Sequence, residues 1–205
     1  MTNFSIEQFQ LDAESVKTWS DQDDRHHNWP VVYTLNSDSE IYIGESLNAS
    51  SRMRQHLEST EKRSLRAVKV VLDDTFNKSV CLDLESYLIQ LLSGDGKYKV
   101  LNRNDGLVNA AYYGRSDYRT RFAEIVEQLR SLDTFTKSIA EIQNSALFKL
   151  SPFKALNEDQ AIAVEAILSD LLRDLDKGVK ESVVVQGDPG TGKTVVALLP
   201  LTWAQ

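Results

Sequence analysis

Two tyrosines, Tyr33 and Tyr42, lie in neighbouring β-type runs, "VVYTL" (31–35) and "EIYIG" (40–44). If the four polar residues 36–39 close a hairpin, Tyr33 pairs directly with Tyr42 on one side of the sheet, with Cβ atoms ~5 Å apart. The opposite side then carries only Val, Thr and Ile, which suffice as a core face. An aromatic pair that stabilises the sheet and a pair that does chemistry both fit this pattern.

A guanidinium and an imidazole follow the hairpin closely. Arg52 and His56 are four residues apart, so they share one face of the helix expected over residues 46–60. Ser46 or Asn48 is the expected N-cap of this helix. Because the helix begins just after the second strand, it can lie back over the sheet and bring both groups near the two phenols.

A glutamate is misplaced on the next helix, expected over residues 79–92 ("SVCLDLESYLIQLL"). On a helical wheel Glu85 falls inside the apolar arc, whereas Asp83, Ser86 and Gln90 form the expected solvent face. A lone inward carboxylate costs roughly several kcal/mol unless it is paired or binds a cation. Glu85 is therefore either half of a buried ion pair, for example with Arg52, or a metal-binding or catalytic acid in a pocket.

These residues together resemble a known family, the GIY-YIG endonucleases, over roughly residues 30–105. The matching elements, in chain order, are Tyr33 in "VVY", Tyr42 in "YIG", Arg52, His56, Glu85 in "LESYLI" and an asparagine in "VLNRN". That asparagine is Asn102 or Asn104, and Asn102 is favoured because it follows the apolar pair Val100-Leu101. Two departures are Val31-Val32 in place of Gly-Ile and Glu45 where some relatives carry a lysine.

The resemblance implies a small three-stranded antiparallel sheet flanked by helices, and hydrolysis of phosphodiester bonds in DNA, with RNA not excluded. A single Mg²⁺ or Mn²⁺ would be held by Glu85 and would polarise the phosphate. The tyrosines would position or deprotonate the attacking water, and Arg52 would stabilise negative charge as it develops. Which tyrosine acts as the base stays open. The alternative is a nucleotide-switched protein in which this fold binds nucleic acid without cutting it.

A second motif, "GDPGTGKT" at residues 187–194, has the P-loop pattern and follows the apolar run Val183–Gln186. Its phosphate-binding residues for ATP are Gly187, Gly190, Gly192, Lys193 and Thr194. Upstream, "LNEDQAIAVEAIL" resembles the adenine-reading motif of superfamily-one helicases, with Gln160 as the adenine contact. Together they resemble the start of a helicase-like ATPase of the Schlafen type, a class that occurs fused behind GIY-YIG domains.

The chain stops at Gln205, eleven residues past Thr194, so no later strand supplies the second carboxylate of an ATPase. We expect either a fragment of a longer protein, whose missing part completes the ATPase, or a vestigial tail. We also expect residues 151–205 to be poorly packed or to lean on a neighbour.

The whole chain is expected to be α/β (α+β). Four segments are expected: an irregular or short helical lead (1–29), the nuclease domain (30–117, with a third strand at 66–73), a helical connector (118–150) and the ATPase segment (151–205).

The net charge of −7 is unevenly distributed: residues 1–29 and 123–205 each carry −4, and residues 30–122 carry +1. Six basic residues fall within eighteen positions and form a candidate phosphate-binding face; they are Arg52, Arg54, Lys62, Arg63, Arg66 and Lys69. No apolar run approaches the ~20 residues of a membrane span, and the N-terminus lacks the features of a signal peptide. The single Cys81 fits a reducing compartment, so a cytoplasmic location is expected.

Overall fold

The computed structural model describes residues 4–102, 111–145, 166–167, 184 and 186. In chain order the elements are β1 (Phe4–Gln10), α1 (Ala13–Ser20), α2 (Arg25–Asn28), β2 (Val31–Asn36), β3 (Glu40–Ser46), α3 (Ala49–Glu58), the short 3₁₀ helix η1 (Thr60–Lys62), β4 (Ala67–Asp73), α4 (Lys78–Asp95), β5 (Lys99–Val100), α5 (Arg115–Ser131) and α6 (Ile139–Asn144). None of the helices in this part of the chain is long and apolar enough to cross a membrane.

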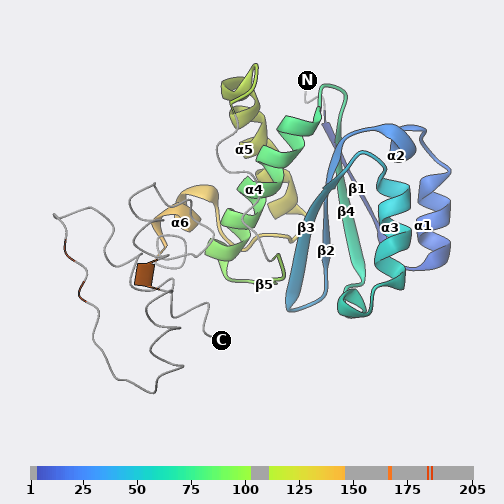
Figure 1. Cartoon of the computed structure of the whole chain (residues 1–205), viewed down its shortest axis with the longest axis horizontal. Coiled ribbons are helices and arrows are strands. Elements are labelled where there is room, and N and C mark those ends of the chain that lie inside the picture. Colours follow the sequence, from blue (N-terminus) through green and yellow to red (C-terminus); the bar gives the residue numbers. More distant parts are fainter. Residues whose placement is uncertain (1–3, 103–110, 146–165, 168–183, 185, 187–205) are drawn as a thin grey trace.

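A mixed five-stranded sheet, in the order β1-β4-β2-β3-β5, forms the centre of the fold (Figure 1). The three strands expected from the sequence, β2, β3 and β4, are present and antiparallel. The expectation of a three-stranded sheet was nevertheless wrong, because β1 adds antiparallel to β4 and the two-residue β5 adds parallel to β3. The α/β class is therefore confirmed, with a larger and mixed sheet.

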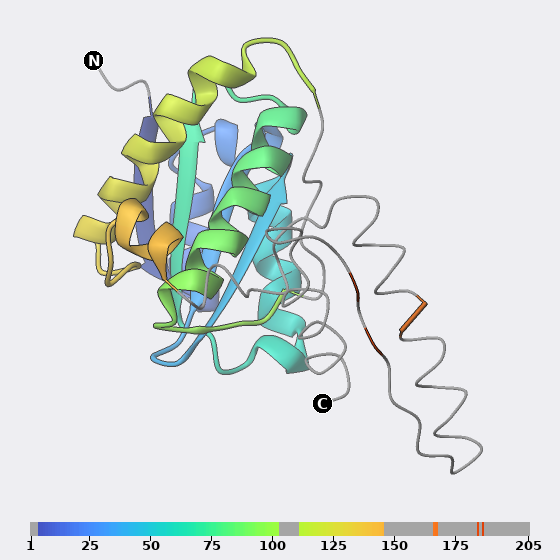
Figure 2. The ribbon, with the colours of Figure 1, turned by 90° about the vertical axis from the view of Figure 1, so that its left-hand side faces the viewer.

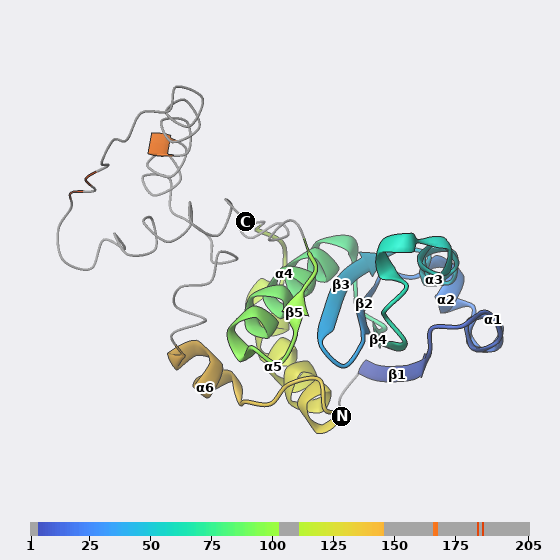
Figure 3. The same cartoon turned by 90° about the horizontal axis from the view of Figure 1, so that it is seen from below.

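Both faces of the sheet are covered by helices. Helices α4 and α5 lie on one face, and α1, α2 and α3 lie on the other (Figure 3). Figure 2, turned to the first face, shows α4 running across the sheet with α5 beside it. Because both faces are buried, β2 is apolar on successive residues rather than on alternate ones, and all of Val31–Leu35 is buried. The side that the sequence suggested as a core face is thus one of two buried faces.

The N-terminal lead is not irregular over residues 4–10, which form the edge strand β1. The Glu7 carboxylate links this strand to helices α1 and α2. Its Oε2 accepts a hydrogen bond from Trp19 Nε1 at 2.6 Å and lies 2.9 Å from Nε2 of the fully buried His26. The polar residues of "FSIEQFQ" obscure its alternation, which is why the sequence pattern missed this strand.

The β2–β3 hairpin has a register shifted by two residues from the one expected. Tyr33 pairs with Gly44, and Tyr42 pairs with Leu35, because Asn36 joins the strand. Only residues 37–39 form the loop, and the Ser37 hydroxyl accepts hydrogen bonds from the backbone N–H groups of Ser39 and Glu40. An even shift keeps every side chain on its expected face, so both tyrosines still lie on one side of the sheet.

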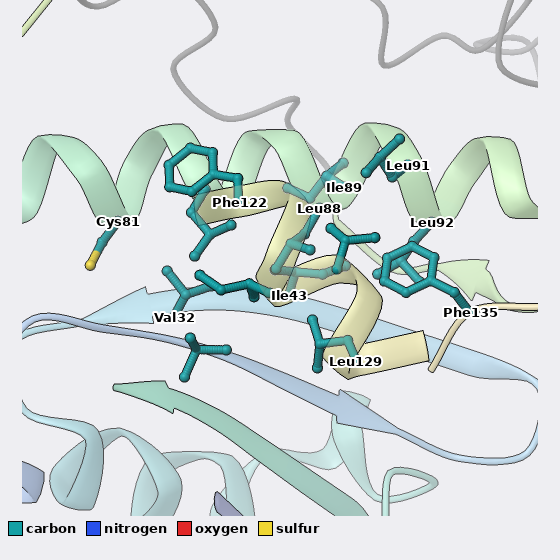
Figure 4. Packing of buried hydrophobic residues seen from close by; sticks show 14 of the residues in the cluster. Val32, Ile43, Cys81, Leu88, Ile89, Leu91, Leu92, Phe122, Leu129 and Phe135 are labelled. Atoms are coloured by element: carbon teal, nitrogen blue, oxygen red, sulfur yellow. The ribbon is translucent and has the colours of Figure 1, made fainter. Parts of the chain in front are cut away.

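Capping residues set both ends of helix α4. The Asn77 side chain accepts a hydrogen bond from the N–H of Val80, and Gly96 ends the helix with φ 77°. Its apolar side packs onto Val32 and Ile43 of the sheet and onto Phe122 and Leu129 of α5 (Figure 4). This cluster forms the larger of the two cores.

The expected solvent face of α4 is wrong for Asp83 and Ser86, which are both buried. Helix α5 covers this face, and Asp83 has its partners on α5 and on Tyr112, which precedes that helix. The carboxylate accepts hydrogen bonds from Tyr112 Oη at 2.8 Å and from Arg119 Nη2 at 2.7 Å. Helices α5 and α6, expected as a connector, thus pack on the domain, and Phe122, Leu129 and Ile142 join its core.

Candidate active site

Tyr33 lies at the centre of the site and is fully buried on the α3 side of the sheet. Its ring crosses directly over Gly44 of the neighbouring strand. A Cβ atom built at position 44 would lie 2.4 Å from the Tyr33 hydroxyl oxygen and 2.5 Å from Cζ. The glycine of "YIG" is therefore required by the tyrosine of "VVY", because no larger residue leaves room for the phenol.

The hydroxyl of Tyr33 contacts two side chains from α3. His56 Nε2 lies 2.8 Å from it, and Arg52 Nε donates a hydrogen bond to it at 3.3 Å. The side chain of Asn48 caps α3, as one of the two expected N-caps, and sets where this helix starts. The four-residue spacing then turns Arg52 and His56 toward the same phenol, as predicted.

Tyr42 borders the same group of side chains but is only half-buried. Its ring centroid lies 6.3 Å from that of Tyr33 and 5.6 Å from that of His56. Lys62 of η1 places its Nζ 3.1 Å from the Tyr42 centroid and 3.2 Å from His56 Nδ1. The sequence analysis placed Lys62 only in a basic cluster; nothing in its spacing identifies the contact with His56.

Burial sets the charge states of this group. It lowers the pKa of His56 to about 3, reinforced by the positive charges of Lys62 and Arg52, so the imidazole is neutral at pH 7. Burial, together with the neighbouring Tyr42, raises the pKa of Tyr33 well above its ordinary value, although Arg52 opposes the shift. Burial lowers the pKa of Lys62 to about 8, aided by the Arg52 charge. At neutral pH the site thus holds a phenol, a neutral imidazole and two cations.

Glu85 is half-buried on α4 and has no ion-pair partner among the described residues. The ion pair with Arg52, one of the two alternatives for Glu85, is not formed, because the guanidinium of Arg52 bonds instead to Tyr33 and to Gln55 Oε1 at 2.9 Å. Burial raises the pKa of Glu85 to about 7, helped by the nearby Glu45 and opposed by Lys78 and Arg52. Glu85 is thus electrostatically coupled to the carboxylate of Glu45 and to the cations Lys78 and Arg52.

Glu45, directly after "YIG", is a second carboxylate near Glu85. It forms an ion pair with Lys78 through Oε1, while its buried Oε2 has no hydrogen-bond partner within the described parts of the chain. An uncompensated buried carboxylate oxygen beside a carboxyl of raised pKa suits a hard divalent cation. No group of three or more His, Cys, Asp or Glu that could hold a metal occurs among the described residues. Two carboxylates still fit Mg²⁺, which keeps several waters and binds substrate phosphate.

Asn102 lies at the end of β5 and holds β3 in place. Its Oδ1 accepts a hydrogen bond from the N–H of Ile43 at 3.0 Å, and its Nδ2 donates to the carbonyl of Ile43 at 2.8 Å. The amide thus extends the strand pairing beyond β5 and fixes the backbone between Tyr42 and Gly44. Asn104 lies outside the described residues.

The motif expected to bind nucleotide also lies outside the described residues: Gln160, Gly187, Gly190, Gly192, Lys193 and Thr194 have no described placement, nor does most of the segment 151–205. Comparison of the chain with family models, with curated proteins and with solved structures gave no match.

Proposed function

We propose that the site hydrolyses phosphodiester bonds in DNA with the help of a divalent cation, as the resemblance to GIY-YIG endonucleases implies. The observation that carries the proposal is the convergence of Tyr33, His56 and Arg52 within hydrogen-bond distance, with Glu85 electrostatically coupled to the same group. A purely structural tyrosine pair requires neither the buried imidazole nor a carboxylate left without an ion-pair partner.

Glu85, with Glu45 beside it, would hold Mg²⁺ or Mn²⁺. When bound, the cation polarises the phosphate and neutralises charge on the leaving oxygen. Arg52 supplies a fixed guanidinium where negative charge grows on the phosphate. Its Nε is already directed by the Tyr33 hydroxyl, which reduces the side-chain entropy lost on substrate binding.

The two tyrosines differ in ways that divide their roles. Burial raises the pKa of Tyr33, but Arg52 donates a hydrogen bond to its oxygen and His56 lies within hydrogen-bond distance, so two neighbours are placed to stabilise a phenolate there. Tyr42 is half-exposed and lies at the solvent side of Tyr33. We infer that Tyr42 positions the attacking water and that Tyr33 accepts the proton of that water as a phenolate. Tyr33 first loses its own proton to solvent, once substrate and cation have added positive charge and opened the buried phenol.

The sequence motif at residues 187–194 supports a further element of the proposal. A P-loop behind the nuclease unit would couple cleavage to ATP binding or hydrolysis by a helicase-like ATPase, in repair or defence against foreign DNA. A longer chain carrying Lys193→Ala tests this. ATP should alter the rate of cleavage by the unsubstituted chain and leave the rate of the variant unchanged.

Cleavage of supercoiled plasmid and of branched DNA with Mg²⁺ or Mn²⁺ tests the nuclease proposal directly. Glu85→Gln keeps the shape of the side chain and removes its charge, so it should abolish cleavage. Glu58→Gln, at the exposed end of α3, is the matched control and should cleave normally. Equal cleavage by Glu85→Gln and the unsubstituted chain would end the assignment of this site.

A further inference from the structure

Lys62 makes a contact that the proposed hydrolysis does not use. Its ammonium lies against the face of the Tyr42 ring and reaches Nδ1 of His56 at 3.2 Å. His56 in turn reaches the Tyr33 hydroxyl through Nε2 at 2.8 Å. Lys62, His56 and Tyr33 therefore form one continuous chain of hydrogen bonds that starts at half-exposed η1 and ends at the centre of the site.

The chemistry of the first link determines the direction of the second. A lysine ammonium can only donate hydrogen bonds, so Nδ1 of His56 must accept. The imidazole is neutral, since its pKa is lowered to about 3, and it carries a single proton. That proton must lie on Nε2, which faces Tyr33. His56 is thus a hydrogen-bond donor to the phenol as long as Lys62 is charged.

This tautomer changes what Tyr33 can do. Its oxygen then accepts two N–H bonds, from His56 Nε2 and from Arg52 Nε, and both would stabilise a phenolate. In the opposite tautomer Nε2 would accept the Tyr33 proton, and Arg52 would remain the only donor of the pair. The two tautomers of one imidazole therefore give Tyr33 two different acidities.

We propose that Lys62 is a positioning residue that fixes His56 in its Nε2–H tautomer and so prepares the Tyr33 oxygen to carry negative charge. The tautomer follows from the contacts of a neutral imidazole beside a charged Lys62, whereas its effect on cleavage rests on the proposed function. Lys62 acts through His56 and needs no contact with substrate.

The tautomer can be read without any activity, by two-bond ¹H–¹⁵N correlation spectra of the full chain with ¹⁵N-labelled histidine at pH 7. The His56 signals are identified by their loss in His56→Gln. We expect a protonated Nε2 in the unsubstituted chain and in Lys62→Arg, which keeps a donor. In Lys62→Met the proton should move to Nδ1 in a large fraction of molecules. A protonated Nδ1 in the unsubstituted chain, or no change in Lys62→Met, would overturn the proposal.

Cleavage rates then test the consequence. Lys62→Met should lower the rate at least roughly tenfold, and Lys62→Arg should restore most of it. Lys17→Met removes one positive charge from an exposed position on α1, outside the basic cluster, and should leave both the tautomer and the rate unchanged. A shifted tautomer with an unchanged rate refutes the positioning role. If the unsubstituted chain cuts no DNA, the proposed function fails, while the spectra still decide the tautomer.

Discussion

Asp83 and Glu85 lie two residues apart on α4, and their carboxylates meet opposite surroundings. Asp83 is buried between α4 and α5, where Tyr112, Arg115 and Arg119 contact it. Glu85 is half-buried near Glu45 and has no ion-pair partner among the described residues, and its pKa is raised to about 7. A buried carboxylate with a full set of donors holds a structure together, whereas one with an incomplete set is poised to bind or react.

The largest difference between Glu85 and Asp83 should be in their effect on the rate of DNA cleavage. Glu85→Gln should reduce the cleavage rate by at least about 100-fold, because the variant loses the charge that would hold the cation. Asp83→Asn should leave the rate of the folded protein within about threefold of normal, because this carboxylate lies between α4 and α5, on the opposite side of the sheet from the phenols. Plasmid nicking, with the folded fraction checked by circular dichroism, compares the two. A comparable loss in both variants would contradict the division between them.

The free energy of unfolding should depend more strongly on Asp83 than on Glu85. Asp83→Asn should lower the free energy of unfolding by about 2 kcal/mol, since it leaves two arginines beside a neutral amide. The loss is below that of a fully buried pair, because the side chains of Arg115 and Arg119 are 32% and 39% exposed. Urea denaturation measures this. Asp117→Asn, on the first turn of α5, is the control and should change stability by less than about 0.5 kcal/mol.

Removing the hydroxyl oxygen of each tyrosine in turn distinguishes the contribution of Tyr33 to stability from that of Tyr42. Tyr33→Phe leaves His56 Nε2 and Arg52 Nε without their shared acceptor and should destabilise the fold by about 1 kcal/mol. Tyr42→Phe keeps the ring beneath Lys62 and should be nearly neutral for stability. Thermal melts of the two variants test this, and equal destabilisation would argue against the central place of Tyr33.

An effect of similar size is a pH dependence of stability that originates at Glu85. Its pKa rises from 4.5 in the unfolded chain to about 7 in the folded protein, so the folded state binds this proton more tightly. The resulting stabilisation is complete below pH 4.5 and is lost as the pH rises to 7. We expect a loss of roughly 1 kcal/mol, less than the full shift gives at ~1.4 kcal/mol per unit, because solvent screens the half-buried group.

Glu85→Gln should remove this component of the pH profile and leave the remainder unchanged. Denaturant melts between pH 4.5 and 8 make the comparison. An identical profile in both proteins would show that Glu85 titrates normally. His56, whose pKa is lowered, adds a separate loss of stability as the pH falls below 6.5, and the sign of the slope distinguishes the two.

The spacing of residues within single elements determines several features of this protein without any tertiary contact. The four-residue interval turned Arg52 and His56 to one side of α3, and the Asn48 side chain capped that helix. The wheel position singled out Glu85, which is half-buried and has a raised pKa. These features depend on helix geometry within one element, which the order of residues fixes directly.

Packing between elements decided the rest. The wheel placed Asp83 opposite the sheet, yet α5, which begins 32 residues later along the chain, covers that side and buries it. The hairpin register moved by two residues because Asn36 joined β2, and the polar β1 was stabilised by pairing with β4. Lys62 contacts His56 only because η1 places the lysine ammonium over the Tyr42 ring, next to the imidazole. Sequence periodicity reports the direction of a side chain, whereas only the tertiary structure determines what it meets there.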